Sequence, residues 1–194
     1  MDPKNIKIIA VGAATQDVFI AGKALRAKRD VRTHNEVETF PLGAKLELES
    51  VIFDTGGGAT NAAVTFARQG FSTGFAGKIG HDPAGVEVVR VLKKEGVESH
   101  HMVKDERFGT GYSTILLADN GERTILSYRG ASHQIKSEDF PVNKPFDADW
   151  LYVSSLAGNM DALKRVLKLA HKHQIRVAIN PGKGELEKPK QLRK

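Results

Sequence analysis

The stretch STGFAGKIGHDPAGVEVVRVLKKEGVESHHMV, residues 72–103, decides the fold class. Its apolar first part predicts a β-strand. Asp82 followed by Pro83 has the form of an N-cap and a first-turn proline, and apolar residues at helical spacing follow until Gly96, so the middle part predicts a helix. Residues 97–103 predict a second strand. A strand, a helix and a strand in succession indicate a βαβ unit, so we expect a parallel sheet with helices on its faces.

The same alternation continues on both sides of this stretch. Before it, the sequence predicts a buried strand at Ile6–Gly12 and a helix at Asn61–Arg68 that stops at Gly70. After it, the sequence predicts a strand at Trp150–Ser154, a helix capped by Asn159 and a strand at Arg176–Ile179. The fold class is therefore predicted to be α/β with a mostly parallel sheet. The last strand has no predicted neighbour on one side, so we expect an open sheet edge and a tendency to associate.

Two stretches interrupt the alternation and predict a separate small β-sheet. Residues 18–54 are polar and β-prone, and residues 112–128 form a hairpin pattern around Asp119-Asn120-Gly121, which suits a type I′ turn. This β element could act as a lid, be an ordinary β extension or form a dimer interface, and the sequence leaves these three readings open. The α/β core then consists of residues 1–17, 55–111 and 129–194.

Composition excludes several classes of protein. The 194 residues contain no cysteine, which rules out disulfide scaffolds, iron–sulfur clusters and cysteine nucleophiles and fits a reducing, cytoplasmic setting. The longest nearly unbroken apolar run, Ile8–Ala14, is far shorter than the roughly 20 residues that span a bilayer. We therefore expect a cytoplasmic protein without a membrane partner.

The net charge of +6 is unevenly distributed along the chain. Lys23–Arg32 holds five basic residues and one acidic residue, and Lys183–Lys194 holds five basic and two acidic residues. Neither segment interleaves aromatic residues that could stack on bases. The charge therefore favours an anionic small molecule over nucleic acid, and we expect the basic C-terminal segment to be a solvated end.

The segment Asp54–Asn61, DTGGGATN, leads straight into a predicted helix. Its three glycines let the backbone approach a ligand closely, and a helix N-terminus presents unpaired N–H groups. It is neither a Walker A loop nor a dinucleotide fingerprint. Its glycines fit a tight turn as well as a binding loop, and the Asn61 amide, which can both donate to and accept from a sugar hydroxyl, favours the binding loop.

Further polar residues lie where predicted strands end. Asp17 follows the first strand with no helix to cap, and Asn180-Pro181 closes the last strand. Ligands of open α/β sheets bind outside the carboxyl ends of the strands, so both positions suit a binding site. Asp82 is better explained as the N-cap of its helix. The histidines show no spacing typical of a metal site, and Ser154-Ser155 lacks the surroundings of a hydrolase nucleophile.

Taken in order, these features resemble the ribokinase-like, or PfkB, family of carbohydrate kinases, over essentially the whole chain. The matching residues are Asp17, Gly56-Gly57-x-x-x-Asn61, Gly77-x-x-Gly80-x-Asp82-x-x-Gly85, Thr110-Gly111, Gly121-Glu122-Arg123 and Asn180-Pro181. The resemblance implies a Rossmann-like three-layer core with a β-sheet lid. It also implies transfer of the γ-phosphoryl group of ATP, with Mg²⁺, to a hydroxyl group of a sugar or nucleoside.

The resemblance implies roles for particular residues. Sugar hydroxyls would be bound by Asp17, Gly56, Gly57 and Asn61, lid contacts would come from Phe19 and from Ser113 or Ile115, and Asn180 would lie near the phosphates and Mg²⁺. No metal ligand is assigned. The lysine usual in the ribokinase version of the glycine motif is Gly58 here, so the substrate stays open.

The family's C-terminal signature, Asp-Thr-x-Gly-Ala-Gly-Asp, has no match in these 194 residues, nor has its later Asn-x-x-Glu segment. That signature supplies the anion hole and the catalytic aspartate. We therefore expect an N-terminal portion of a sugar kinase that binds substrate but does not catalyse alone, with a C-terminal companion chain as one candidate partner and a homodimer through the lid as another. The alternative is a shortened protein that binds a sugar, a nucleoside or a partner protein without chemistry.

Overall fold

The computed structural model describes residues 2–140 and 146–192, which form two compact units. The core unit comprises Met1–Gln16, Thr55–Gly111 and Arg129–Lys194, and the β unit comprises Asp17–Asp54 and Tyr112–Tyr128. The predicted division of the chain differs from these units at Asp17, which the sequence analysis assigned to the core.

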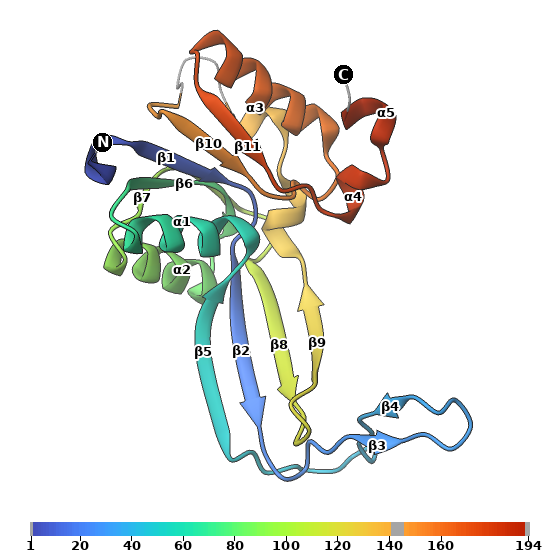
Figure 1. The fold of residues 1–194 in the computed structure, drawn as a ribbon. Coiled ribbons are helices and arrows are strands. Elements are labelled where there is room, and N and C mark those ends of the chain that lie inside the picture. Colours follow the sequence, from blue (N-terminus) through green and yellow to red (C-terminus); the bar gives the residue numbers. More distant parts are fainter. Residues whose placement is uncertain (1, 141–145, 193–194) are drawn as a thin grey trace. The chain divides into compact units, whose positions relative to one another are not determined.

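The core unit is built on a five-stranded sheet in the order β11-β10-β1-β6-β7 (Figure 1). The strands are β1 (Lys7–Val11), β6 (Ser72–Gly80), β7 (Glu98–Asp105), β10 (Trp150–Val153) and β11 (Arg176–Ile179). Every neighbouring pair in this sheet is parallel. The predicted α/β fold with a parallel sheet is confirmed, and each of these strands lies within two residues of its predicted bounds.

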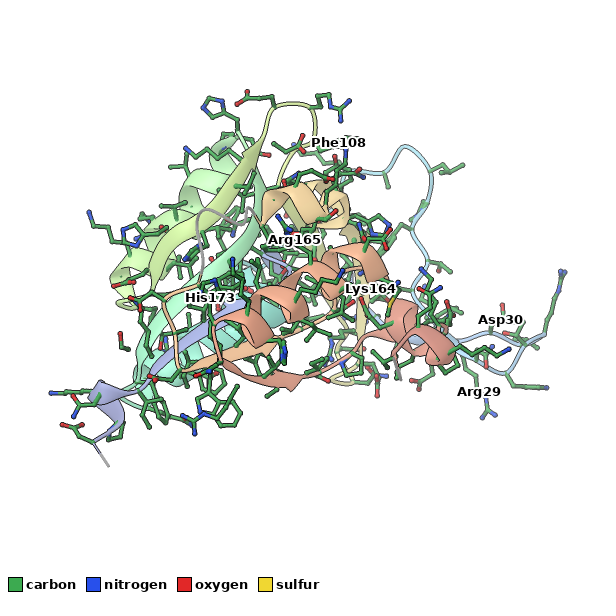
Figure 2. The ribbon with its side chains drawn as sticks, turned by 90° about the horizontal axis from the view of Figure 1, so that it is seen from above. Arg29, Asp30, Phe108, Lys164, Arg165 and His173 are labelled. Carbon is green, nitrogen blue, oxygen red and sulfur yellow. The ribbon has the colours of Figure 1, made fainter. Side chains whose placement is uncertain are left out.

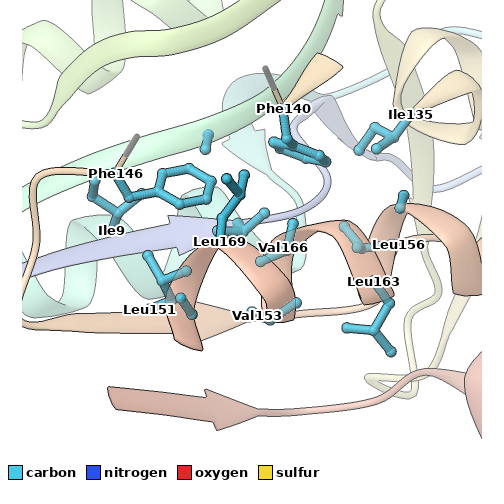
Figure 3. Close-up of a cluster of buried hydrophobic side chains, with 14 of the residues drawn as sticks. Ile9, Ile135, Phe140, Phe146, Leu151, Val153, Leu156, Leu163, Val166 and Leu169 are labelled. Carbon is cyan, nitrogen blue, oxygen red and sulfur yellow. The ribbon is translucent and has the colours of Figure 1, made fainter. Parts of the chain in front are cut away.

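Helices pack on both faces of this sheet, because successive residues of β1 point to opposite sides. Ile9 and Val11 belong to a buried cluster with α3 (Met160–Lys172), whereas Ala10 belongs to a second cluster with α1 (Gly58–Arg68) and α2 (Pro83–Lys94). Figure 3 shows Leu163, Val166 and Leu169 of α3 against the strand residues Ile9, Leu151 and Val153. The core unit therefore has the three layers that were predicted.

The predicted helix starts are found in α2 and α3. The Asp82 carboxylate accepts a hydrogen bond from the Gly85 backbone N–H at 2.8 Å, and the Asn159 side chain accepts from the backbone N–H groups of Asp161 and Ala162. Arg165, on α3, further ties this helix to the preceding segment by donating from Nε to the Phe140 carbonyl at 2.8 Å (Figure 2).

The open edge predicted for the last strand is present among the described residues. β11 stands at one end of the sheet order and pairs with β10 alone. Ile179, at its carboxyl end, is exposed.

The residues after β11 differ from the predicted solvated end. They form the short helices α4 (Lys183–Leu186) and α5 (Pro189–Leu192), and Glu185 is buried, with 2% of its surface exposed. The prediction is wrong for this residue because its carboxylate is enclosed by backbone N–H donors from two turns. Arg193 and Lys194 lie outside the described residues.

The β unit contains a four-stranded sheet in the order β5-β2-β8-β9 and a short two-stranded ribbon. The strands of the sheet are β2 (Thr15–Ala21), β5 (Ser50–Gly56), β8 (Gly111–Leu117) and β9 (Arg123–Tyr128); those of the ribbon are β3 (Lys28–Arg29) and β4 (Glu36–Val37). The second, smaller sheet that was predicted is therefore confirmed.

The hairpin of β8 and β9 is also present, with Tyr112 opposite Tyr128, but its connection is not the type I′ turn that was predicted. Such a turn needs positive φ at both central residues, whereas here Gly121 has φ +88° and Asn120 does not have positive φ. Instead, the Asn120 side chain accepts a hydrogen bond from the Glu122 backbone N–H at 3.0 Å. The longer loop lets the asparagine side chain close the turn.

No helix in the described part of the chain has the length and apolar character that crossing a membrane requires.

Candidate functional site

The turn after β1 meets the N-terminus of α1, and the turns after β10 and β11 follow it along the same edge of the sheet. The Ala59 backbone N–H, in the first turn of α1, donates to the Ala13 carbonyl just after β1, at 3.3 Å. Beyond β10, the Ser154 N–H donates to the Val11 carbonyl, and beyond β11, the Asn180 N–H donates to the Val153 carbonyl. This edge of the sheet is where ligands of open α/β folds bind.

The glycine loop, Gly56–Gly58, forms the centre of this edge. Gly57 has φ +104°, and a Cβ there would overlap the Ala13 carbonyl oxygen and lie 2.8 Å from the Ala14 Cα. The Thr60 hydroxyl donates to the carbonyls of Gly56 and Gly57, which orders the loop from within the helix. The glycines are therefore required both by the backbone conformation and by the close approach of the turn after β1.

Asn61 lies in the first turns of α1, and its side chain is exposed. Its backbone N–H donates to the Gly57 carbonyl at 3.0 Å, so the residue is fixed to the glycine loop. The carboxamide is left available to solvent at the start of the helix. This is the position in which a hydroxyl-bearing ligand would meet both the amide and the helix N-terminus.

Ser154 is a member of this edge that the sequence analysis did not assign. It is buried, and a Cβ placed on Gly12 would overlap its hydroxyl oxygen, while a Cβ on Gly58 would lie 3.2 Å from it. The hydroxyl therefore fits between two glycines that are 46 positions apart in the sequence. The available sequence signal was the pair Ser154-Ser155 at the end of a predicted strand.

Glu185 supports the same edge from α4. Its Oε1 accepts hydrogen bonds from the N–H groups of Leu156 and Gly158, and its Oε2 accepts from the Ser155 hydroxyl and the Gly182 N–H, all at 2.7–2.9 Å. Burial raises the pKa of this carboxyl group, but the hydrogen bonds from Gly158, Ser155 and Leu156 outweigh it and lower the pKa below its usual value. No pattern in the sequence indicated this role, because three of the four donors lie in the turn after β10, 27–30 residues before Glu185.

The remaining predicted binding residues belong to the β unit. Asp17 and Phe19 are two residues apart on β2 and therefore share one face of that strand. Ser113 and Ile115 are likewise two residues apart on the neighbouring strand β8, where both are buried. Asp17 was expected just past the first strand of the parallel sheet. It is instead the third residue of β2, because the chain enters the second sheet directly after the turn that follows β1.

Comparison with known proteins decides the family. The model of the pfkB family carbohydrate kinases matches residues 16–192. The chain belongs to this family. Relatives include the ribokinase of Schizosaccharomyces pombe, which is 27% identical over 181 residues (91% of this chain and 53% of the relative), and a fructokinase of Escherichia coli, which is 35% identical over 104 residues (53% of this chain and 33% of the relative).

Solved structures have the same fold. The fructokinase of Xylella fastidiosa with bound ATP superposes with a TM-score of 0.64 at 21% identity, covering 89% of this chain and 50% of that one. The chain thus spans about half the length, or less, of these relatives.

A second motif of the family, Gly77-x-x-Gly80-x-Asp82-x-x-Gly85 with Thr110, holds elements of the core unit together in this chain. Asp82 Oδ2 accepts from the Thr110 N–H at 2.7 Å, and Oδ1 accepts from the Thr110 hydroxyl at 2.6 Å as well as from Gly85. The Thr110 hydroxyl in turn accepts from the Gly80 N–H at 2.9 Å. Burial raises the pKa of Asp82, yet its hydrogen bonds, first among them that from the Thr110 hydroxyl, lower it below the usual value. The motif therefore locks β6, α2 and the Thr110 segment together.

In residues 2–140 and 146–192, no group of three or more histidine, aspartate or glutamate side chains is placed to hold a metal ion. The exposed Asn180 carboxamide offers a single oxygen.

Proposed function

We propose that this chain is the sugar-binding portion of an ATP-dependent carbohydrate kinase. The observation that carries the proposal is the glycine loop, packed against the turns after β1 and β10 and followed by the exposed Asn61 amide. Backbone N–H groups, a helix N-terminus and an amide are a donor and acceptor set that suits the hydroxyl groups of a sugar or of the ribose of a nucleoside.

Within this proposal, Gly56, Gly57 and Asn61 bind substrate hydroxyls from the core unit. The β unit acts as a lid and contributes Asp17, Phe19 and Ser113 or Ile115. Asn180, which follows β11 on the same sheet edge, lies on the side of the ATP phosphates. The relatives are a ribokinase and a fructokinase, which supports a pentose or ketose substrate, and the ATP in the fructokinase structure supports ATP as the donor.

Phosphoryl transfer depends on groups that orient the nucleophile and stabilise developing charge. These 194 residues contain no Asp-Thr-x-Gly-Ala-Gly-Asp segment to provide the anion hole and base. We therefore propose that residues 1–194 bind substrate, and that turnover with ATP and Mg²⁺ needs a polypeptide that carries this segment, in the same chain or as a companion. The competing proposal is a binding protein without chemistry.

Calorimetry with D-ribose, D-fructose and adenosine tests the binding site. We expect saturable binding of one of these compounds, and Asn61→Leu is expected to weaken it at least about tenfold, since buried hydrogen bonds to a bound hydroxyl are lost. Gln69→Leu, which removes an exposed amide at the other end of the same helix, is the matched control and is expected to change the dissociation constant less than about twofold.

Two results would contradict the proposal: no binding of any of the three compounds, or binding that Asn61→Leu leaves unchanged. A companion experiment separates the kinase from the binding protein. Addition of a chain that carries the missing signature is expected to produce sugar phosphate from ATP, whereas sugar binding that never leads to phosphate transfer would favour the binding protein.

We further propose a second copy of the chain as a partner of the β unit. Both edge strands of its main sheet expose apolar side chains: Val51, Ile52 and Phe53 on β5, and Ile125, Leu126 and Tyr128 on β9. Exposed apolar edge strands are prone to pair or pack with another copy. This supports a homodimer through the β unit.

Sedimentation equilibrium tests the homodimer. We expect the mass of two chains for the wild type and of one chain for the double variant Phe53→Asp, Leu126→Asp, because two charges cannot be buried without partners at an apolar interface. Val86→Asp replaces an equally exposed apolar residue on α2 and is expected to leave the dimer intact. A wild-type protein that is monomeric at all accessible concentrations would exclude the interface.

A further inference from the structure

Glu185 connects two turns at the edge of the sheet that carries the proposed sugar site. One is the β10 turn, Ser154–Gly158, and the other is the turn at Gly182 after β11. Lys188, in the residues that follow α4, adds a hydrogen bond from its ammonium group to the Gly158 carbonyl at 2.6 Å. The segment after β11 is therefore attached to the β10 turn at several points.

The carboxylate is specifically suited to this place. Each of its two oxygens accepts from two donors, three of which are backbone N–H groups, and the side chain is 2% exposed. An amide of the same size would present an NH₂ group to two of those donors. Buried donors without acceptors are costly, so Gln cannot replace Glu here without movement of a turn.

Movement of the β10 turn would reach the glycine loop. Ser154 precedes Ser155, whose hydroxyl donates to Glu185, and Ser154 itself is fitted between Gly12 and Gly58 with no room for a single added carbon on Gly12. Interiors packed this closely transmit small displacements to their neighbours. The contacts run from Glu185 through the two serines to Gly58 and the start of α1.

We propose that Glu185 is a positioning residue, whose carboxylate fixes the β10 turn and thereby the glycine loop in its ligand-binding arrangement. The inference rests on the proposed function, because it assigns the sugar affinity of the glycine loop to a residue that does not touch the ligand. It predicts that the loss of Glu185 changes sugar binding as well as stability.

The experiment compares Glu185→Gln with Glu187→Gln, which changes an exposed glutamate two residues later whose carboxylate lies 3.8 Å from the Lys183 ammonium group. The first readout is the backbone amide NMR signals of Gly57 and Gly58, with exposed Gly96 as the reference. The second is the dissociation constant of D-ribose or D-fructose, whichever the wild type binds more tightly. We expect Glu185→Gln to shift the Gly57 and Gly58 signals and to weaken binding about tenfold, with Glu187→Gln like the wild type.

A Glu185→Gln protein that melts at a lower temperature but keeps the glycine-loop signals and the sugar affinity would overturn the proposal and leave a purely structural role. If this variant does not fold, Ser155→Ala replaces it in the experiment, because it removes one of the four donors and keeps the carboxylate. Ser155→Ala is expected to shift the Gly57 and Gly58 signals, and unchanged signals would overturn the proposal. If the wild type binds none of the sugars, the proposed function fails, while the amide signals still decide whether Glu185 positions the loop.

Discussion

Gly57→Ala is expected to destabilise the protein by about 3 kcal/mol or more and to abolish sugar binding. At φ +104° and ψ 139°, Gly57 has a backbone conformation that is essentially restricted to glycine. The added methyl group would also overlap the Ala13 carbonyl, which is backbone and cannot rotate away. Strain and overlap therefore add at one residue.

Thermal unfolding measures this loss, and for a chain of this size a decrease in melting temperature of roughly 6–12 °C is expected. Gly96→Ala is the matched control, since Gly96 also has positive φ, +74°, but no atom lies within 4 Å of an added Cβ. It is expected to cost about 1 kcal/mol and to leave sugar binding unchanged. Equal losses in the two variants would show that the close approach to Ala13 does not constrain the loop.

Asp82→Ala is expected to destabilise the core unit by about 3 kcal/mol, because it removes the N-cap of α2 together with both hydrogen bonds from Thr110. Urea unfolding measures the free energy. Asp161→Ala, which replaces an exposed aspartate in the first turn of α3, is the control and is expected to cost less than about 1 kcal/mol.

The difference in unfolding free energy between the wild type and the Asp82→Ala variant should depend on pH. The hydrogen bonds outweigh the effect of burial and lower the pKa of Asp82 below its ordinary value of 3.8, so the folded protein binds this proton less readily than the unfolded chain. The stabilisation by the carboxylate is therefore fully present above the unfolded pKa and is lost as the pH falls through the lower, folded pKa. We expect a constant difference between wild type and variant above about pH 5 and a shrinking one below about pH 4. A difference that grows on acidification would contradict this assignment.

The Asp82 cluster also illustrates how a family motif can be read. Its order and spacing pointed to a carbohydrate kinase, while the residue itself was predicted to be an N-cap, and the hydrogen bonds of Asp82 agree with that local prediction. In this chain the aspartate of the motif caps α2 through Gly85 and also accepts hydrogen bonds from Thr110, which follows it by 28 residues. The motif does not identify a ligand contact.

The sequence by itself determined the main strands and helices of the core unit and the class of the fold. Period-two and period-3.6 patterns, Asp82-Pro83, Asn159 and the glycines after helices depend on contacts within a few residues, and β11 begins and ends where the sequence predicted. The glycine loop could be singled out for the same reason, because a run of three glycines before a helix is a local signal.

Tertiary structure alone decided which of these local features meet. Glycine is needed at position 57 because Ala13 approaches it closely, and Ser154 fits where it does because Gly12 and Gly58 have no side chains. Glu185 joins two turns, one that precedes it by more than 20 residues and one that precedes it by three. The transfer of Asp17 into the second sheet and the burial of Glu185 followed from pairing and packing with distant segments. Hydrogen bonds and close contacts between such segments have no fixed spacing in the sequence, so only the folded chain reveals them.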